Sequence, residues 1–318
     1  MKNLLDLARA YDKNVHVHLL PNINNNIISN MNFIYDVRWQ NGDIEPPYYI
    51  LTYLMDCYYC LPQRPDLATL FGWQAINNGY NEWLIDDVTK IRLVDTDGIT
   101  RLIGEIYRNY TKYNPLLKDY FSRIPLKSFR YIASYLLKGY VITEKGYSDK
   151  YLPGAYRGLI KRIPILKNIL LDSYGSALLD ISSPFVVDHE IHINADISKS
   201  RNITHSFSLK LLKLFRDHLV HINSRNGEMV RQYTITDEEE LTIVIFGLLY
   251  ASRCNNFHGN VASRLNSLNA DKETFEMYMQ TATFCGQQGR IFRTVRAILN
   301  GQPGISAGQR VVRPTDQY

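Results

Sequence analysis

Apolar side chains recur every three or four positions along most of the chain, which is the spacing of one face of an α-helix. The pattern is strongest in the aromatic run at 48–61, which ends before Pro62, and at 67–84, where Pro65 suits the start of a helix. The same periodicity predicts further helices at 1–12, 98–122, 126–142, 206–222, 272–285 and 288–299. The sequence therefore predicts an all-α fold.

The most apolar stretch is Leu241–Tyr250, which is long enough for a buried helix of about three turns. Thr236 and Glu239 precede it with the spacing of a capping box, in which each side chain binds the backbone of the other. The pattern predicts that this helix begins at about Asp237.

One segment departs from the helical period. Ser182–Ile197 alternates between apolar and polar residues, which predicts a strand of one small β-hairpin. On a single strand, Asp188, Glu190 and His192 would share one face and offer metal ligands. We favour a polar strand face, so no metal site and no cofactor are predicted.

Composition is that of a globular protein: 318 residues, 45% hydrophobic and 21% charged. The net charge of +5 is compatible with binding nucleic acid. No apolar run has the length of a membrane span, and residues 1–10 lack the apolar core of a signal peptide, so a cytoplasmic protein without a membrane partner is expected. Cys57 and Cys60 lie in an aromatic run without a second cysteine pair, which favours core thiols over a zinc site.

Candidate chemistry follows the apolar helix directly, at Arg253 and His258. Arginine binds phosphate through a planar fork, and histidine exchanges protons near neutral pH. Five positions along a helix correspond to ~7.5 Å of rise and ~140° of rotation, so the two side chains do not share a face. Two copies facing each other across a two-fold axis would make a better site than one, which predicts a homodimer with a composite site.

The segment that carries this pair reads R-C-N-N-F-H-G and resembles the R-x4-H signature of HEPN domains. A second resemblance lies in the early helix, where F-x-W-x-A-I-N-x-x-Y is similar to a helix of the same families. Its matching positions are Phe71, Trp73, Ala75, Asn77 and Tyr80. A buried Asn77 needs hydrogen-bond partners, so it either braces the motif helix or lies on a helix surface.

The resemblance implies an all-α, HEPN-like helical bundle with helical extensions. Its domain would span 48–300, with an insertion at about 143–200. Residues 1–47 would form an N-terminal helix and an Asn-rich irregular segment, and 301–318 a flexible basic tail.

The resemblance also implies an endoribonuclease that needs no metal and cleaves single-stranded RNA. His258 would transfer the protons, Arg253 would neutralise charge on the phosphate, and Asn255 or Asn256 would support them. The products would be 2′,3′-cyclic phosphate and 5′-hydroxyl ends. Such a protein would serve as a toxin or antiphage effector, controlled by an antitoxin or a phage-derived trigger.

Other basic residues offer further candidates. Arg216 and His221 form a second R-x4-H pair, which ranks below the first because it lacks the N-x-x-H-G context. Basic residues also recur at helical spacing in two places, where they would form a solvated face or contact RNA: Arg157, Lys161, Arg162 and Lys167, and Arg290, Arg293 and Arg296.

Two other interpretations remain open. A non-catalytic HEPN module would bind protein or RNA and use Arg253 and His258 for packing. Alternatively, the chain is an unrelated helical protein in which the motif occurs by chance.

Overall fold

The computed structural model describes residues 48–83, 94–109, 117–223, 230–257, 272–282 and 284. Within them the protein is mostly helical, as the periodicity predicts, with two small antiparallel hairpins in place of the one expected. The expectations for residues 1–47, 288–299 and 301–318 lie outside the described residues. No described helix is long and apolar enough to cross a membrane.

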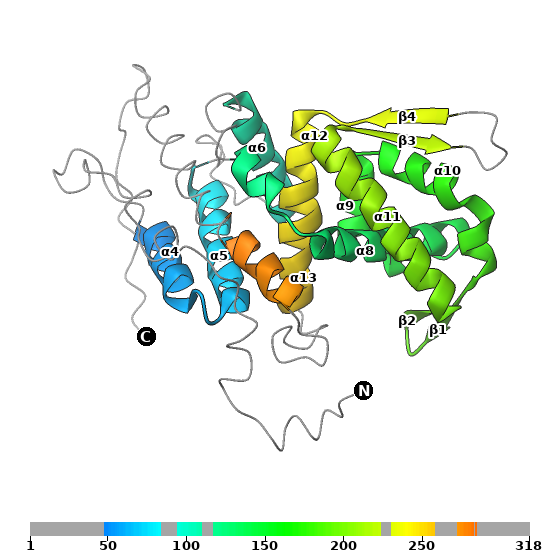
Figure 1. The fold of residues 1–318 in the computed structure, drawn as a ribbon. Coiled ribbons are helices and arrows are strands. Elements are labelled where there is room, and N and C mark those ends of the chain that lie inside the picture. Colours follow the sequence, from blue (N-terminus) through cyan, green and yellow to red (C-terminus); the bar gives the residue numbers. More distant parts are fainter. Residues whose placement is uncertain are drawn as a thin grey trace.

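Two N-terminal helices pack against each other at one end of the molecule (Figure 1). They are α4 (Tyr48–Cys60) and α5 (Pro65–Trp83), so the early helices begin and end within two residues of the predicted positions. Cys57 is buried between them, whereas Cys60 is partly exposed. Residues 272–282 form a further helix, and its Met279 and Ala282 belong to the same apolar cluster.

The middle of the molecule is a continuous helical run from Asp237 to Phe257 (Figure 1). It consists of α12 (Asp237–Thr242), a π-helix η4 (Ile243–Tyr250) and α13 (Ala251–Phe257). The capping box of Thr236 and Glu239 is confirmed, and so is burial of the apolar run. The run differs from the prediction in its bonding, because a π-helix bonds from i to i+5. On one side it contacts α6 (Asp95–Arg108), which begins before the predicted boundary at 98.

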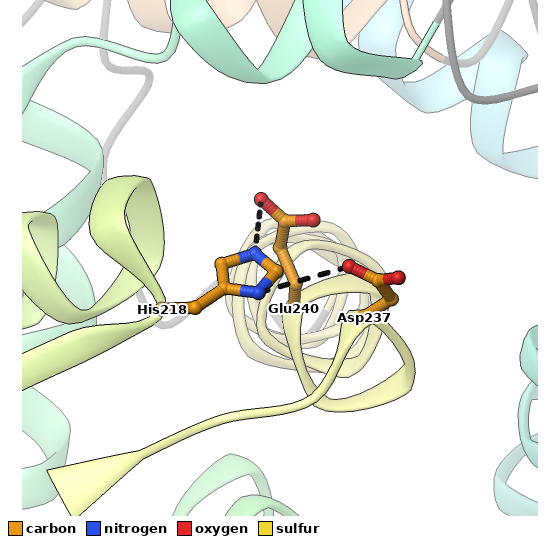
Figure 2. A group of neighbouring side chains, drawn as sticks. All are labelled: His218, Asp237 and Glu240. Carbon is orange, nitrogen blue, oxygen red and sulfur yellow. Dashed lines mark ion pairs between the residues drawn. The ribbon is translucent and has the colours of Figure 1, made fainter.

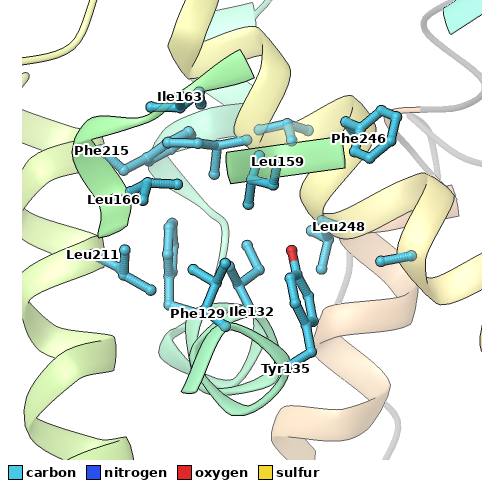
Figure 3. Close-up of a cluster of buried hydrophobic side chains, with 14 of the residues drawn as sticks. Phe129, Ile132, Tyr135, Leu159, Ile163, Leu166, Leu211, Phe215, Phe246 and Leu248 are labelled. Carbon is cyan, nitrogen blue, oxygen red and sulfur yellow. The ribbon is translucent and has the colours of Figure 1, made fainter. Parts of the chain in front are cut away.

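On its other side, η4 packs against α8 (Leu126–Glu144) and α9 (Gly154–Arg162). Pro164 separates α9 from α10 (Ile165–Asp180), which is kinked at Gly175 where φ is +43°, a value that favours glycine. α11 (Ile197–Asp217) then packs along α8. Figure 3 shows the apolar side chains that α8, α9, α10, α11 and η4 contribute to the main core.

The first hairpin joins β1 (Ser182–Val187) to β2 (Glu190–Ala195). Its two turn residues, Asp188 and His189, both have positive φ, as in a tight two-residue turn. The single strand predicted here was therefore wrong: the segment contains both strands and the turn. Glu190 and His192 lie on the same face of β2, but Asp188 lies in the turn, so the three residues do not line one strand face.

The second hairpin, β3 (Leu219–Asn223) with β4 (Val230–Thr234), corrects the predicted helix 206–222. The helix ends at Asp217 because His218 adopts a left-handed conformation. Beyond it, Val220 and Ile222 are buried while their neighbours His221 and Asn223 are exposed. This alternation is the two-residue period of a strand, which the preceding apolar helix obscured.

Candidate functional site

The motif helix is fixed at its start by the capping box. The backbone N–H of Glu239 donates to Thr236 Oγ1 at 3.2 Å, and the backbone N–H of Thr236 donates to Glu239 Oε2 at 2.8 Å. These two bonds satisfy amides that no residue inside the helix can bond. The helix therefore has a defined origin from which the position of Arg253 follows.

Close packing fixes the same helix along its length. The hydroxyl of Tyr135 on α8 donates to the carbonyl of Gly247 at 2.8 Å, and a Cβ at Gly247 would lie 3.1 Å from that hydroxyl oxygen. On α9, the Arg162 guanidinium lies 4.4 Å from the ring centre of Phe246. Contacts with both α8 and α9 thus hold the helix in place before it reaches Arg253.

Arg253 lies on α13 with its guanidinium directed at α6. Its Nη2 is 3.2 Å from Oδ2 of Asp95, and about a quarter of each side chain is exposed (26% and 29%). Burial acts to lower the pKa of Arg253, but contacts with the Cys254 sulfur and with Asp95 outweigh burial and leave the pKa raised. The guanidinium is therefore charged and oriented while still reaching solvent, as a phosphate-binding arginine requires.

Asp95 is the centre of a polar network that joins three helices. Its Oδ1 accepts hydrogen bonds from the Tyr80 hydroxyl at 2.9 Å and from Asn77 Nδ2 at 3.2 Å, and Asn77 also bonds to the Tyr80 hydroxyl. Burial, followed by the negative charge of Asp95, raises the pKa of Tyr80, so its phenol stays protonated and donates. Asp95 also lies in the first turn of α6, where the helix dipole favours a carboxylate.

The network brings together the two segments that carry the resemblance. Asn77 and Tyr80 lie on α5, Arg253 lies on α13, and Asp95 connects them. Trp73 and Tyr250 make a second contact between the segments, with ring centres 6.0 Å apart. Asn77 is therefore braced against the motif helix through Asp95 and does not lie free on a helix surface.

Tyr250 lies one turn before Arg253 on the same helix. Burial, together with the neighbouring Cys254 sulfur, raises the pKa of Tyr250 to about 12. Its ring lies 4.9 Å from that of Phe246. Tyr250 is thus a neutral residue that closes the apolar side of the Arg253 environment.

Asp95 was missed in the sequence, although it contributes most of the contacts at this site. The signal present was a pair of acids, Asp95 and Asp97, just before the predicted start of a helix at 98. That pattern is typical of a helix N-terminus and does not indicate an ion pair with a distant arginine. Only the packing of α5, α6 and α13 distinguishes Asp95 from Asp97.

Several predicted site residues lie beyond the described part of the chain. They are His258, the side chains of Asn255 and Asn256, and Arg290, Arg293 and Arg296. The structure therefore places Arg253 and its partners, while the Arg253–His258 arrangement stays a prediction.

The second R-x4-H pair is not on one helix. Arg216 lies in the last turn of α11 and His221 on β3, with the left-handed residue His218 between them, and both side chains are exposed. The geometry of a single helix therefore does not determine how Arg216 and His221 lie relative to each other. Of the basic segment, Arg162 donates to Thr96 O and Thr100 Oγ1, and Lys167 pairs with Glu144 at 2.9 Å, so these two serve internal contacts.

One cluster offers metal-ligand atoms: His218, Asp237 and Glu240 place one such atom each within 4.8 Å of one another. Figure 2 shows that each ring nitrogen faces a different carboxylate. Nδ1 is 3.7 Å from Asp237 and Nε2 is 3.4 Å from Glu240. Since one ion at bond lengths of about 2 Å needs one nitrogen and both carboxylates to converge, the geometry fits polar contacts that join the end of α11 to α12 better than a metal site.

No protein-family model matches the chain, and no curated protein and no solved structure is significantly similar to it. Function is therefore inferred from the motif and from the contacts around Arg253.

Proposed function

We propose that this protein is a HEPN-type endoribonuclease that cleaves single-stranded RNA without a metal ion. One observation carries the proposal: Arg253 of the R-C-N-N-F-H-G segment is held by Asp95, which Asn77 and Tyr80 of the second motif hold in turn. Two sequence segments chosen independently for the same resemblance thus form one contact network. A chance match of both segments would not require them to meet.

The chemistry uses the RNA's own 2′-hydroxyl as the nucleophile. His258 removes its proton, the oxygen forms a bond to the adjacent phosphorus, and the bond to the 5′-oxygen of the next nucleotide breaks. A His258 side chain protonates this 5′-oxygen, which leaves as a hydroxyl group. The other product carries a 2′,3′-cyclic phosphate. Arg253 stabilises the negative charge that develops on the phosphate oxygens. DNA lacks the 2′-hydroxyl and is not cleaved.

The direct test is cleavage of total RNA by the full-length protein in the presence of EDTA, with the new ends mapped. Arg253→Ala and His258→Ala should each lower the rate at least about 100-fold, the usual range for a charge-stabilising donor or a general acid–base. Arg253→Lys keeps the charge but loses the planar fork and should give an intermediate rate.

Matched controls are available on exposed residues away from this site. Arg201→Ala on α11 and His192→Ala on β2 remove the same side-chain types and should leave the rate unchanged. Equal rates for parent, Arg253→Ala and His258→Ala, with all three folded, would exclude the proposed mechanism.

A homodimer with a composite site is part of the proposal, because helical spacing predicts that Arg253 and His258 point to different faces. Mixing the inactive Arg253→Ala and His258→Ala proteins, with unfolding and refolding to exchange subunits, should restore part of the activity if each site takes groups from both chains. A site within one chain would give no recovery. Sedimentation at several concentrations would establish the mass of the assembly.

The ion pair is also what a second candidate requires, a non-catalytic HEPN module in which Arg253 serves packing. Arg253 already has a carboxylate partner, which is also what a packing role would require. In that case Arg253→Ala would lower thermal stability, and no variant or parent would cleave RNA under any activating condition.

A further inference from the structure

A hollow of about 490 Å³ lies beside α8, and its volume is in the range of ligand-binding pockets. One wall comes from α8 and the other includes Thr274 and Met277 of the helix at 272–282. We refer to it as the α8 groove. Its α8 wall consists of Lys127, Arg130, Tyr131, Ser134, Tyr135 and Lys138.

The groove is basic. Lys127 and Lys138 lie eleven positions apart, which is three helical turns and roughly 16 Å along α8, with Arg130 between them. Glu273 lies 3.7 Å from Arg130, and both side chains are about half exposed, so solvent screens this pair. Among the described residues, no carboxylate forms an ion pair with Lys138. Arg130 and Lys138 together outweigh Glu273, so these residues give the groove a net positive charge, which suits a polyanion.

The groove also contains an aromatic side chain held in place. Tyr131 is partly exposed, and its ring packs edge-to-face on the buried ring of Tyr135 at 5.7 Å. The Tyr135 hydroxyl donates to the carbonyl of Gly247, which holds the Tyr135 ring in this orientation. An ordered aromatic ring between cations is the combination by which proteins bind single-stranded nucleic acid, since bases stack on the ring and phosphates pair with the cations.

A groove residue, Tyr135, is hydrogen-bonded to the helix that carries the proposed site. Gly247 precedes Arg253 by six residues, about 9 Å of rise if the helix were regular, and both belong to the continuous run from Asp237 to Phe257. A ligand in the groove would therefore lie on the same rigid body as Arg253.

We propose that the α8 groove binds single-stranded RNA outside the cleavage site, with phosphates on Lys127, Arg130 and Lys138 and a base stacked on Tyr131. This inference deepens the proposed nuclease function and depends on it for the identity of the ligand. The cations and the partly exposed ring of Tyr131 between them favour RNA over an acidic protein surface, which would make no use of a stacking ring.

Binding is measured by fluorescence anisotropy of a labelled, fully 2′-O-methylated RNA, which the proposed chemistry cannot cleave. Lys127→Glu/Lys138→Glu in the full-length protein should weaken binding at least about tenfold and lower the slope of log K against log salt by roughly 1 to 1.5. Tyr131→Leu should weaken binding about tenfold and leave the slope unchanged, because stacking involves no counterion release.

Controls carry the same changes elsewhere. Lys161→Glu/Lys213→Glu reverses two exposed lysines on α9 and α11, and Tyr59→Leu changes a tyrosine on α4 that is 89% exposed. Both controls should bind as the parent does. An equal loss in the lysine control would mean that total charge, not the groove, determines binding, and would overturn the inference.

The outcomes separate the groove from the nuclease. If Arg253→Ala binds the RNA normally but does not cleave, and the groove variants lose binding, both proposals are supported. If cleavage depends on Arg253 while the groove variants bind as the parent, the groove assignment is wrong and the nuclease stands. If the groove binds RNA and no cleavage occurs, the nuclease is wrong and the groove stands. Equal competition by polyglutamate would overturn the base-stacking role of Tyr131.

Discussion

The guanidinium of Arg253 lies 3.2 Å from the carboxylate of Asp95, and this ion pair links the last helix of the central run to the first turn of α6. The two residues are far apart in sequence, and neither motif includes Asp95. Asp95 touches Arg253 and does not reach the scissile phosphate in the proposed mechanism. We therefore regard Asp95 as a positioning residue for Arg253.

Asp95→Asn keeps the shape of the side chain and removes its charge. We expect the free energy of unfolding to fall by about 1 kcal/mol, since the pair is partly exposed, and RNA cleavage to slow about tenfold because Arg253 loses its orientation. Asp97→Asn is the matched control, because it removes the same charge from the same helix turn at an exposed position. If both variants changed kcat equally, the effect would come from the helix dipole and not from the ion pair.

Gly98 and Gly104 on α6 provide a test of how closely Tyr80 packs. A Cβ at Gly98 would lie 2.3 Å from the Tyr80 ring, whereas a Cβ at Gly104 would have no atom within 4 Å. Gly98→Ala should therefore destabilise the protein by about 1–3 kcal/mol through overpacking. Gly104→Ala should stabilise it by up to about 1 kcal/mol, because alanine favours the helix.

Chemical denaturation of the two glycine variants measures this difference directly. Both substitutions have the same helix-propensity effect, so the gap between them reports the contact with Tyr80. Similar stabilities for Gly98→Ala and Gly104→Ala would show that α6 does not approach Tyr80 this closely.

Cys57 makes the stability of the folded protein depend on pH in the alkaline range. Burial raises the pKa of its thiol from 9.0 to about 12, and the negative charge of Cys60 acts in the same direction. The folded state therefore holds a proton that the unfolded state releases above pH 9, so this stabilisation is complete below pH 9 and is lost as pH rises toward 12.

Between pH 8 and pH 10, the parent should lose about 1.4 kcal/mol more than Cys57→Ala, which has no thiol to ionise. Urea denaturation at both pH values measures this difference. Alkylation at pH 8 should also modify Cys60 before Cys57, because the thiolate is the reactive form. Equal labelling of the two thiols, or equal pH dependence of the two proteins, would contradict the buried position of Cys57.

Arg216 and His221 should be dispensable for cleavage. Each is exposed, and they lie on a helix and a strand separated by a left-handed residue. Arg216→Ala and His221→Ala should keep the parental kcat/KM within about twofold, as is usual for exposed residues outside a site. A loss comparable to that of His258→Ala would identify the second pair as a catalytic site in its own right.

The sequence by itself determined the elements whose signals are local. Thr236 and Glu239 fix a helix start through bonds three residues apart, and the run Leu241–Tyr250 is too apolar to be exposed. Tertiary structure decided the features that depend on residues distant in sequence. Leu219–Asn223 became a strand because Val230–Thr234 pairs with it, and Asp95 became the partner of Arg253 because α5, α6 and α13 pack together. A hydrogen bond or ion pair between remote segments leaves no period in the sequence, so only the folded chain shows which of two neighbouring acids, Asp95 or Asp97, holds the arginine.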